Sequence, residues 1–229
     1  TSFAWNGFCA EYCGTSHANM RFKVFTVSPA EFDAWAAHQK TNAVGSAPPP
    51  ATADSGKAAA PAVSASVATT GTTTPGSAKT PPAPPATPVM NVSDTASATF
   101  PRNRLPEWVK PKTPTPAALT FDPSVTGDVA RGATIFKTAP CIACHAIRGV
   151  PTAARIVGPN LTHVGSRTTI AGGIYPNDLE HLHKWIKNAP EMKPGSLMPL
   201  FGKAEKGDTP GLYTDQQIAD LAAYLSSLK

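Results

Sequence analysis

Apolar residues recur at helical spacing in the second half of the chain, first over residues 127–136 and then over residues 179–186. Their apolar faces consist of Val129, Ala133 and Phe136, and of Leu179, Leu182, Trp185 and Ile186. A third stretch begins at Thr214, and Gln217 three residues later completes a capping box. Its apolar stripe consists of Ile218, Leu221, Leu225 and Leu228. This spacing is typical of amphipathic helices and predicts a small helical domain over residues 126–229.

The first half of the chain follows other patterns. Residues 21–27 alternate Arg, Lys and Thr with Phe and Val, which predicts a β-strand. Residues 41–99 are dominated by Ala, Pro, Thr, Ser, Gly and Val, without aromatic residues. Such a segment cannot bury enough apolar surface to offset its ordering entropy, so we expect a disordered or extended tether. Residues 100–125 bring back Arg, Leu, Trp and Phe among prolines, and we expect an ordered strap there rather than more linker.

Charge and hydropathy narrow the classes of partner. The formal net charge is +5, from 20 Lys and Arg against 15 Asp and Glu. Basic residues do not form a stripe with interleaved aromatic residues, so we expect no nucleic-acid partner. A run of about 18 apolar residues is also absent from the sequence, so we expect no membrane span in this chain. The mildly basic helical domain suits docking on an acidic redox partner.

The sequence Cys141-Ile142-Ala143-Cys144-His145 has the C-x-x-C-H spacing of c-type haem attachment. In such a site each cysteine forms a thioether with one haem vinyl group, and the histidine is the proximal iron ligand. The alternatives are a thioredoxin-like C-x-x-C motif and half of a zinc site. Both are disfavoured because no second cysteine pair follows and a histidine directly follows Cys144. We therefore predict covalent haem c, which is assembled outside the cytoplasm.

The other axial iron ligand is expected downstream, where Met192 and Met198 are the two methionines. Met198 lies in the Gly- and Pro-rich stretch 193–199, whose irregular backbone can direct a thioether at iron. Met192 has less of this framing, and a single Met is also a common core filler. We predict His145 and Met198 as the axial pair, with His/His ligation as the alternative. His/Met ligation raises the reduction potential and leaves no open position for oxygen, which suits electron transfer.

Residues 126–229 resemble the class I cytochrome c family, an all-α fold. The resemblance implies that Gly132 and Phe136 meet Tyr224 where the first and last helices cross. It also implies that Gly158-Pro159-Asn160-Leu161 lies against the haem, and that the Pro159 carbonyl accepts a hydrogen bond from the unligated nitrogen of His145. Such a partner orients the imidazole ring.

Three more residues resemble those that surround the haem propionates in this family, namely Arg167, Tyr175 and Trp185. For Trp185, plain core packing is an equal alternative. The remaining histidines of the domain are expected on its surface, namely His163, His181 and His183.

A second candidate site lies near the N-terminus, where residues 9–20 read C-x-E-x-C-G-x-x-H-x-x-M. Cysteine, histidine and methionine are soft ligands suited to copper. Cys9 and Cys13 on one loop can bridge two copper ions, with His17 on one ion and Met20 as a weak ligand on the other. The Glu11 backbone carbonyl is placed for a further weak contact. The alternatives are a Cys9–Cys13 disulfide, credible in an oxidising compartment, and a mononuclear zinc or copper site, but a disulfide leaves the ordered His and Met unexplained.

Residues 7–35 resemble the dinuclear copper (CuA) loop of subunit II of haem–copper cytochrome c oxidases. Glu11 and Gly14 favour this family over the similar site of nitrous oxide reductase. The resemblance implies that residues 1–40 are the last strands and the copper loop of a cupredoxin-like β-sandwich. In the family, two membrane helices, most of the sandwich and one further copper histidine precede this loop. We therefore expect this chain to be the C-terminal part of a longer protein.

A cytochrome c domain fused to subunit II implies the electron-entry subunit of a caa-type terminal oxidase. Electrons would pass from an external donor (a cytochrome, another redox protein or a quinol-oxidising complex) through haem c to CuA and on to subunit I. The oxygen chemistry and proton translocation belong to other subunits. The expected location is the periplasmic or outer face of the bacterial membrane, with the missing N-terminal part as anchor. The alternatives are the entry subunit of a CuA-containing nitric oxide reductase and a stand-alone electron carrier.

Overall fold

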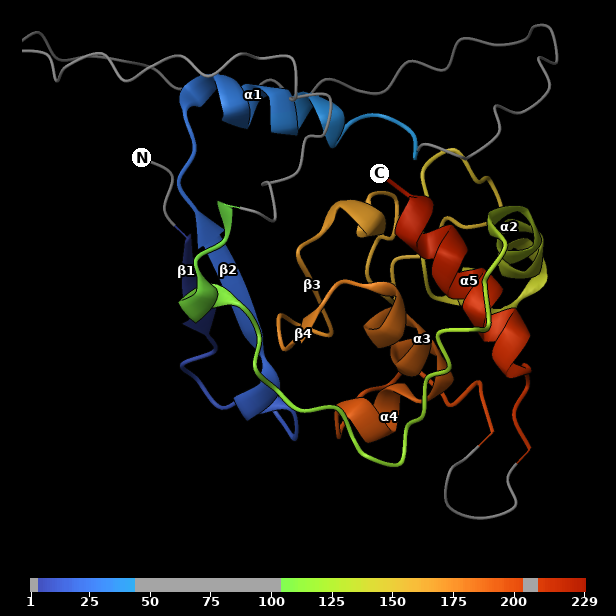
Figure 1. Cartoon of the computed structure of the whole chain (residues 1–229). Helices are drawn as coiled ribbons and strands as arrows, with labels where there is room; N and C mark the ends of the chain where they lie inside the picture. Colours follow the sequence, from blue (N-terminus) through green and yellow to red (C-terminus); the bar gives the residue numbers. More distant parts are fainter. Residues whose placement is uncertain (1–3, 44–103, 204–209) are drawn as a thin grey trace, which may run out of the picture.

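The computed structural model describes residues 4–43, 104–203 and 210–229, so the expected tether falls outside the described residues except at positions 41–43. The N-terminal segment, residues 4–43, contains strands β1 (Ala4–Phe8) and β2 (Arg21–Phe25) and helix α1 (Pro29–His38). The haem domain, residues 126–229, contains helices α2 (Val129–Thr138), α3 (Leu179–Lys187), α4 (Ala189–Met192) and α5 (Asp215–Ser227), with strands β3 (Thr169–Ile170) and β4 (Tyr175–Pro176). Short 3-10 helices occupy His17–Asn19, Glu107–Val109, Pro140–Ala143 and Val164–Ser166. Figure 1 shows the hairpin and α1 on one side and the crossed helices on the other.

Helices α2 and α5 cross at Gly132, as the sequence predicted. A Cβ atom at this position would lie 2.0 Å from the Asp220 carbonyl oxygen, so only glycine allows the two backbones to approach this closely. One turn further on, the rings of Phe136 and Tyr224 pack with their centroids 5.7 Å apart. The crossing therefore joins the first and last helices of the domain.

A buried carboxylate strengthens this crossing. Asp220 is only 2% exposed and accepts hydrogen bonds from Arg131 Nε at 2.9 Å and from the backbone nitrogen of Asp128 at 2.7 Å. The hydrogen bonds with Arg131 hold the pKa of Asp220 below its usual range. Asp128 in turn caps α2 by accepting from the Arg131 backbone nitrogen. Three residues thus satisfy the first turn of α2 and tie it to α5.

The predicted capping box of α5 is confirmed, because Thr214 and Gln217 exchange side-chain and backbone hydrogen bonds. The whole predicted stripe of this helix is buried, although Leu228 lies just beyond its end. The other two faces were predicted less well. Val129 is 44% exposed and Leu179 is 50% exposed, because both lie in the first turn of their helices, at the edge of the buried face.

The prediction that three histidines lie on the surface is wrong for two of them. His163 is 7% exposed and stacks on His38 of α1, with ring centroids 4.4 Å apart. His183 is 4% exposed and packs edge-on against Phe121. His181 is partly exposed and lies 2.7 Å from the Asp178 carboxylate. Each ring is in contact with a residue that the helical pattern of its own segment does not include: His38 of α1, Phe121, or the cap residue Asp178.

The N-terminal segment has a different character from the haem domain. β1 and β2 pair antiparallel from Ala4 with Phe25 to Phe8 with Arg21. The described residues contain no sheet of more than two strands, and an isolated hairpin of this size is marginally stable. Helix α1 was not predicted, although Ser28 and Glu31 form a capping box around Pro29, a signal that the sequence carries.

Residues 104–125 run between the two parts, in green in Figure 1. Arg104 pairs with Glu31 of α1 at 3.0 Å, and Asn6 of β1 donates to the Trp108 carbonyl. Further on, Thr115 accepts from Lys184 of α3, and Leu119 is buried in the core of the haem domain. This segment therefore makes side-chain contacts at both ends.

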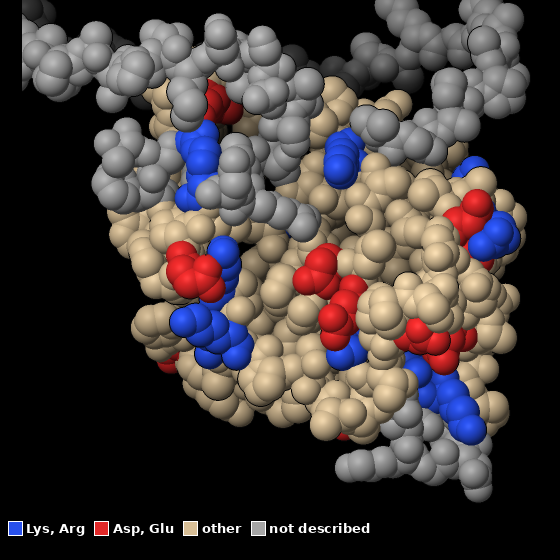
Figure 2. Space-filling model, viewed as in Figure 1, with Lys and Arg blue, Asp and Glu red and all other residues tan. Residues whose placement is uncertain are grey.

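Among the described residues, no helix is both long and apolar enough to cross a membrane. On the face seen in Figure 2, Lys and Arg alternate with Asp and Glu, and neither sign forms a continuous patch.

Candidate metal and haem sites

The loop between β1 and β2, residues 9–20, gathers the sulfur and nitrogen donors that the sequence singled out. The hairpin ladder extends into it, because the Cys9 backbone nitrogen donates to the Met20 carbonyl at 3.0 Å. Gly14 turns the chain with a φ of 123°, and a short 3-10 helix then carries His17. We call residues 9–20 the copper loop.

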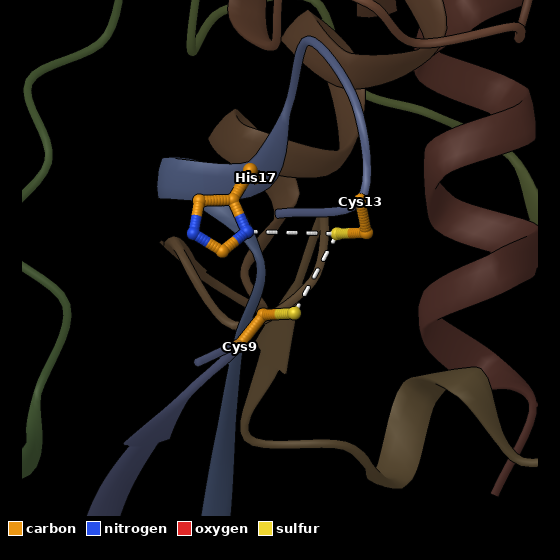
Figure 3. A group of neighbouring side chains, drawn as sticks. All are labelled: Cys9, Cys13 and His17. Carbon is orange, nitrogen blue, oxygen red and sulfur yellow. Dashed lines mark hydrogen bonds between the residues drawn. The ribbon is translucent and has the colours of Figure 1, made fainter. Parts of the chain in front are cut away.

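Four of the predicted donor groups lie within a few ångströms of one another, and Figure 3 shows three of them, Cys9, Cys13 and His17. Cys9 Sγ lies 3.5 Å from Cys13 Sγ, and Cys13 Sγ lies 3.7 Å from His17 Nδ1. Met20 Sδ lies 3.8 Å from Cys13 Sγ. The two thiols are free, since a disulfide needs sulfurs about 2.05 Å apart.

The fifth predicted group also lies at this cluster. The Glu11 backbone carbonyl accepts from Cys9 Sγ at 3.1 Å, so its oxygen lies beside a thiol. The hydrogen bond with Cys9 raises the pKa of the Cys13 thiol, and burial and the charge of Cys9 act in the same direction. A soft metal ion would reverse this, because it binds the thiolate and displaces the proton. Two thiols, an imidazole and a thioether form a donor set that fits copper.

The attachment motif begins in the 3-10 helix Pro140–Ala143, directly after α2. Burial raises the pKa of the Cys141 thiol to about 11, so it is neutral at physiological pH. His145 Nδ1 lies 2.8 Å from the Pro159 carbonyl oxygen, the contact that the resemblance implied. Because the carbonyl can only accept, Nδ1 carries the proton and Nε2 is left as the free ligand atom. Gly158 packs on the same ring, and a Cβ there would lie 2.6 Å from His145 Cε1.

An apolar pocket with an empty volume of about 290 Å³ opens beside this histidine. It is lined by Phe136, Cys141, His145, Leu161, Ile186, Met198, Leu221 and Leu225. The residues come from α2, α3, α5 and the loops between them. One imidazole, one thioether and a thioether-forming cysteine thus face an otherwise apolar pocket, which fits a haem group.

The two candidate methionines have different surroundings. Met198 lines the pocket, whereas Met192 is 3% exposed and belongs to the hydrophobic core. Met192 also ends α4, and its carbonyl accepts from the Tyr175 hydroxyl at 2.8 Å. The geometry therefore brings Met198, and not Met192, together with His145.

The three residues that resemble propionate neighbours each make a contact within the protein. Tyr175 is buried, and its hydroxyl donates a hydrogen bond to the Met192 carbonyl. An Arg167 guanidinium nitrogen donates to the Asn160 carbonyl, in the loop that also holds Pro159. Trp185 is partly buried against the core. These contacts show that each residue has a packing role, whatever it contributes to haem binding.

Sequence reasoning did not give the residues through which the two parts of the chain touch. Residues 15–21 of the N-terminal segment touch residues 171–173 and 193–195 of the haem domain. The only signal for this was the glycine content of both stretches, which does not name a partner.

Comparisons with known proteins bear on both parts of the chain. A model of the cytochrome c family matches residues 129–229. Cytochrome c of Tetrahymena pyriformis is 34% identical over 117 residues, which cover 47% of this chain and 97% of that protein. Cytochrome c oxidase subunit 2 of Alkalihalophilus pseudofirmus is 37% identical over 99 residues, which cover 43% of this chain and 25% of that protein.

Cytochrome c oxidase subunit 2 of Bacillus subtilis is 23% identical over 210 residues. This match covers 90% of the chain, so it extends well beyond the haem domain, and 37% of that protein. The chain thus spans between a quarter and just over a third of the length of these two subunits. A cytochrome c domain with this attachment motif implies covalent haem c. The chain therefore belongs to the cytochrome c family through residues 129–229 and is homologous to cytochrome c oxidase subunit 2.

Proposed function

We propose that this chain is part of the electron-entry subunit of a haem–copper terminal oxidase. It receives electrons from an external donor and passes them through haem c and a dinuclear CuA centre to oxidase subunit I. The observation that carries the proposal is the presence of two distinct donor sets on one chain, one around the pocket beside His145 and one in the copper loop. The homology with oxidase subunit 2 supports the same assignment.

In the haem domain, Cys141 and Cys144 would hold the haem covalently, and His145 and Met198 would ligate its iron. The Pro159 carbonyl fixes the ring orientation of His145. Arg167, Tyr175 and Trp185 would be the neighbours of the haem propionates, as in the family that they resemble. When bound, haem c supplies a one-electron couple, and CuA supplies a second one. The apolar lining of the pocket excludes water from the iron and so favours a high reduction potential.

In the copper loop, both copper ions would be held by the thiolates of Cys9 and Cys13. His17 and Met20 would supply one further ligand each, and the Glu11 carbonyl would make a weak contact. The loop belongs to a cupredoxin-like domain whose other strands, membrane helices and remaining copper histidine precede these residues in the full-length protein. Residues 41–99 act as a tether, which raises the local concentration of the haem domain to roughly millimolar near the copper site. The assembly lies on the periplasmic or outer face of the membrane, where its partners are subunit I and an electron donor.

Rapid reduction of the intact, haem- and copper-loaded protein tests this function. An electron delivered to the haem should reappear as loss of the CuA absorbance, with a first-order rate that does not depend on protein concentration. The matched control is Cys13→Ser, which should keep the haem spectrum and its reduction but lose the copper signal. Two bound copper ions in the Cys13→Ser protein, or a haem that stays reduced beside an oxidised copper pair, would contradict the proposal.

A further inference from the structure

The copper loop meets the haem domain through two backbone strips. The Arg21 backbone nitrogen, at the end of the copper loop, donates to the Gly172 carbonyl at 2.8 Å. The Ser16 hydroxyl donates to the Pro194 carbonyl. We call residues 171–173 and 193–195 the docking surface. Because its hydrogen-bond acceptors are backbone carbonyls, the contact depends on the path of the chain rather than on particular side chains.

The backbone of the docking surface has an unusual conformation. Gly172, Gly173 and Gly195 have φ values of 75°, 82° and 85°. Ala171 has a φ of 57° and is the only residue other than glycine with a positive φ in the described part of the chain. Such a conformation is costly for alanine and is held only where surrounding contacts compensate. Here the strained residue, Ala171, directly precedes Gly172, whose carbonyl accepts from the Arg21 backbone nitrogen.

The same glycines permit the close approach of the loop. A Cβ at Gly173 would lie 2.7 Å from the Arg21 carbonyl oxygen. A Cβ at Gly195 would lie 3.0 Å from Thr15 Cβ and 3.1 Å from Ser16 Oγ. Side chains at these two positions would therefore separate the two parts.

A charged side chain also lies within the contact. Lys193 donates to the Ala171 carbonyl at 3.3 Å, which holds its ammonium group within the docking surface. A Cβ at Gly172 would lie 2.9 Å from Lys193 Nζ, so this glycine leaves room for the ammonium group.

The docking surface also connects the proposed ligands of the two centres. Met198 lies on the same loop as Lys193. The Met198 backbone nitrogen donates to the Ser196 hydroxyl at 3.3 Å. On the other side, Ser16 directly precedes His17. A single hydrogen bond, from Ser16 to Pro194, therefore links the backbone that carries one proposed iron ligand to the backbone that carries a proposed copper ligand.

We propose that residues 171–173 and 193–195 are the surface through which the haem domain docks on the copper loop for electron transfer, so that electrons leave the haem on its Met198 side. The inference rests on the proposed function. Each transfer oxidises the haem iron by one electron and reduces the copper pair by one electron, and no proton or group moves with it. The contact shortens the path because it replaces a jump through solvent by covalent bonds and one hydrogen bond.

The test compares Gly195→Asn and Ser16→Ala in the intact, haem- and copper-loaded protein. Asparagine tolerates a positive φ, so Gly195→Asn adds bulk at the contact with little cost to the loop itself. Ser16→Ala removes the hydroxyl donor without adding bulk. The matched control is Leu197→Asn, which introduces the same residue on the same loop at a side chain that is 99% exposed. The weak charge-transfer band of the Met-ligated haem checks that each variant keeps its iron site.

The first readout is the relaxation of the copper electron-spin signal, which a nearby ferric haem accelerates at short distance. The second is the rate of haem-to-copper electron transfer. Gly195→Asn should lose the haem-induced acceleration and slow transfer by about tenfold or more, because the new side chain would overlap Thr15 and Ser16 in the docked state. Ser16→Ala should slow transfer less, and Leu197→Asn should behave as the parent.

Three outcomes separate the possibilities. If both centres form and Gly195→Asn keeps the parent relaxation and transfer rate, the docking surface is wrong and the proposed function stands. If Leu197→Asn loses as much as Gly195→Asn, the loop as a whole and not the contact controls transfer, and the docking surface is again wrong. If the parent protein forms no copper signal at all, both the proposed function and the docking surface fall.

Discussion

In the haem domain, the proposed iron ligands line a pocket built by three helices that pack through buried side chains. In the N-terminal segment, the proposed copper ligands occupy one loop of a two-stranded hairpin whose Trp5, Phe8 and Phe22 are exposed. The first site is positioned by a core and the second by short-range sequence spacing. Changes in the core should therefore affect stability first, and changes in the copper loop should affect metal binding first.

The helix crossing offers the most severe test of this difference. Gly132→Val should destabilise the haem domain by about 3 kcal/mol or more, because the new side chain overlaps the α5 backbone and Tyr224. Chemical denaturation followed by haem absorbance measures this. Ala130→Val, on the exposed side of the same helix, is the matched control and should cost less than about 1 kcal/mol.

If the copper loop depends on the docking surface, the copper signal of the Gly132→Val protein should disappear in the same transition as the haem domain. Copper that remains bound after the haem domain has unfolded would show that the copper loop binds metal without its contacts to the haem domain.

The two methionines of the haem domain separate ligation from packing. Met192→Ala should cost about 2–4 kcal/mol of unfolding free energy, because it leaves a cavity in the core, and should leave the haem spectrum unchanged. Met198→Ala should abolish the weak charge-transfer band of the oxidised haem and lower its reduction potential. Spectroscopy with a potentiometric titration checks both. If the band is lost in Met192→Ala and kept in Met198→Ala, then Met192 and not Met198 is the iron ligand.

Asp220 provides the next largest effect and has a defined pH dependence. Asp220→Asn should cost about 2 kcal/mol near neutral pH, because the hydrogen bonds from Arg131 become weaker without the charge. The folded-state pKa of Asp220 is lowered, so its stabilising contribution is present above the unfolded value and is lost as the pH falls through the folded value. Unfolding free energies at several pH values should converge for the parent and Asp220→Asn under acid conditions. Parallel curves would mean that Asp220 is not charged in the fold.

Much of both sites followed from the sequence, because their information is local. The spacing of Cys141, Cys144 and His145 and that of the copper-loop donors name their chemistry directly. The structure places Cys141 and His145 at one pocket and gathers the copper-loop donors. The capping box at Thr214 is local in the same way. Predictions failed where a distant segment decides burial. His163 is covered by α1 and His183 by Phe121, and neither partner lies within reach of a helical period. The contact of residues 171–173 and 193–195 with residues 15–21 also joins distant segments, and glycine content alone does not identify the partner of such a contact.

His38 of α1 contacts His163 of the haem domain, so substitution of His163 tests whether the N-terminal segment separates from the haem domain in acid. Burial lowers the pKa of His163; the backbone of Lys229 and of Thr41 opposes this, and the charges of His38 and Arg148 add to it. The unfolded state then binds a proton more readily than the folded state, so stability is fully present above the unfolded pKa and falls as the pH drops below it. His163→Gln should flatten this dependence between about pH 7 and pH 5, around the ordinary histidine pKa.

Because His38 stacks directly on His163, the first structural effect of acid should be release of the end of α1 from the haem domain. Hydrogen exchange of the Ala43 backbone amide, which donates to the Arg148 carbonyl, reports this release. Exchange at Ala43 should accelerate at pH 5 in the parent and change less in His163→Gln. Equal acceleration in both proteins would assign the acid response to another group. The loss of stability should be smaller than that caused by Asp220→Asn, because only one contact between the two parts depends on these rings, and the core around Gly132 remains closed.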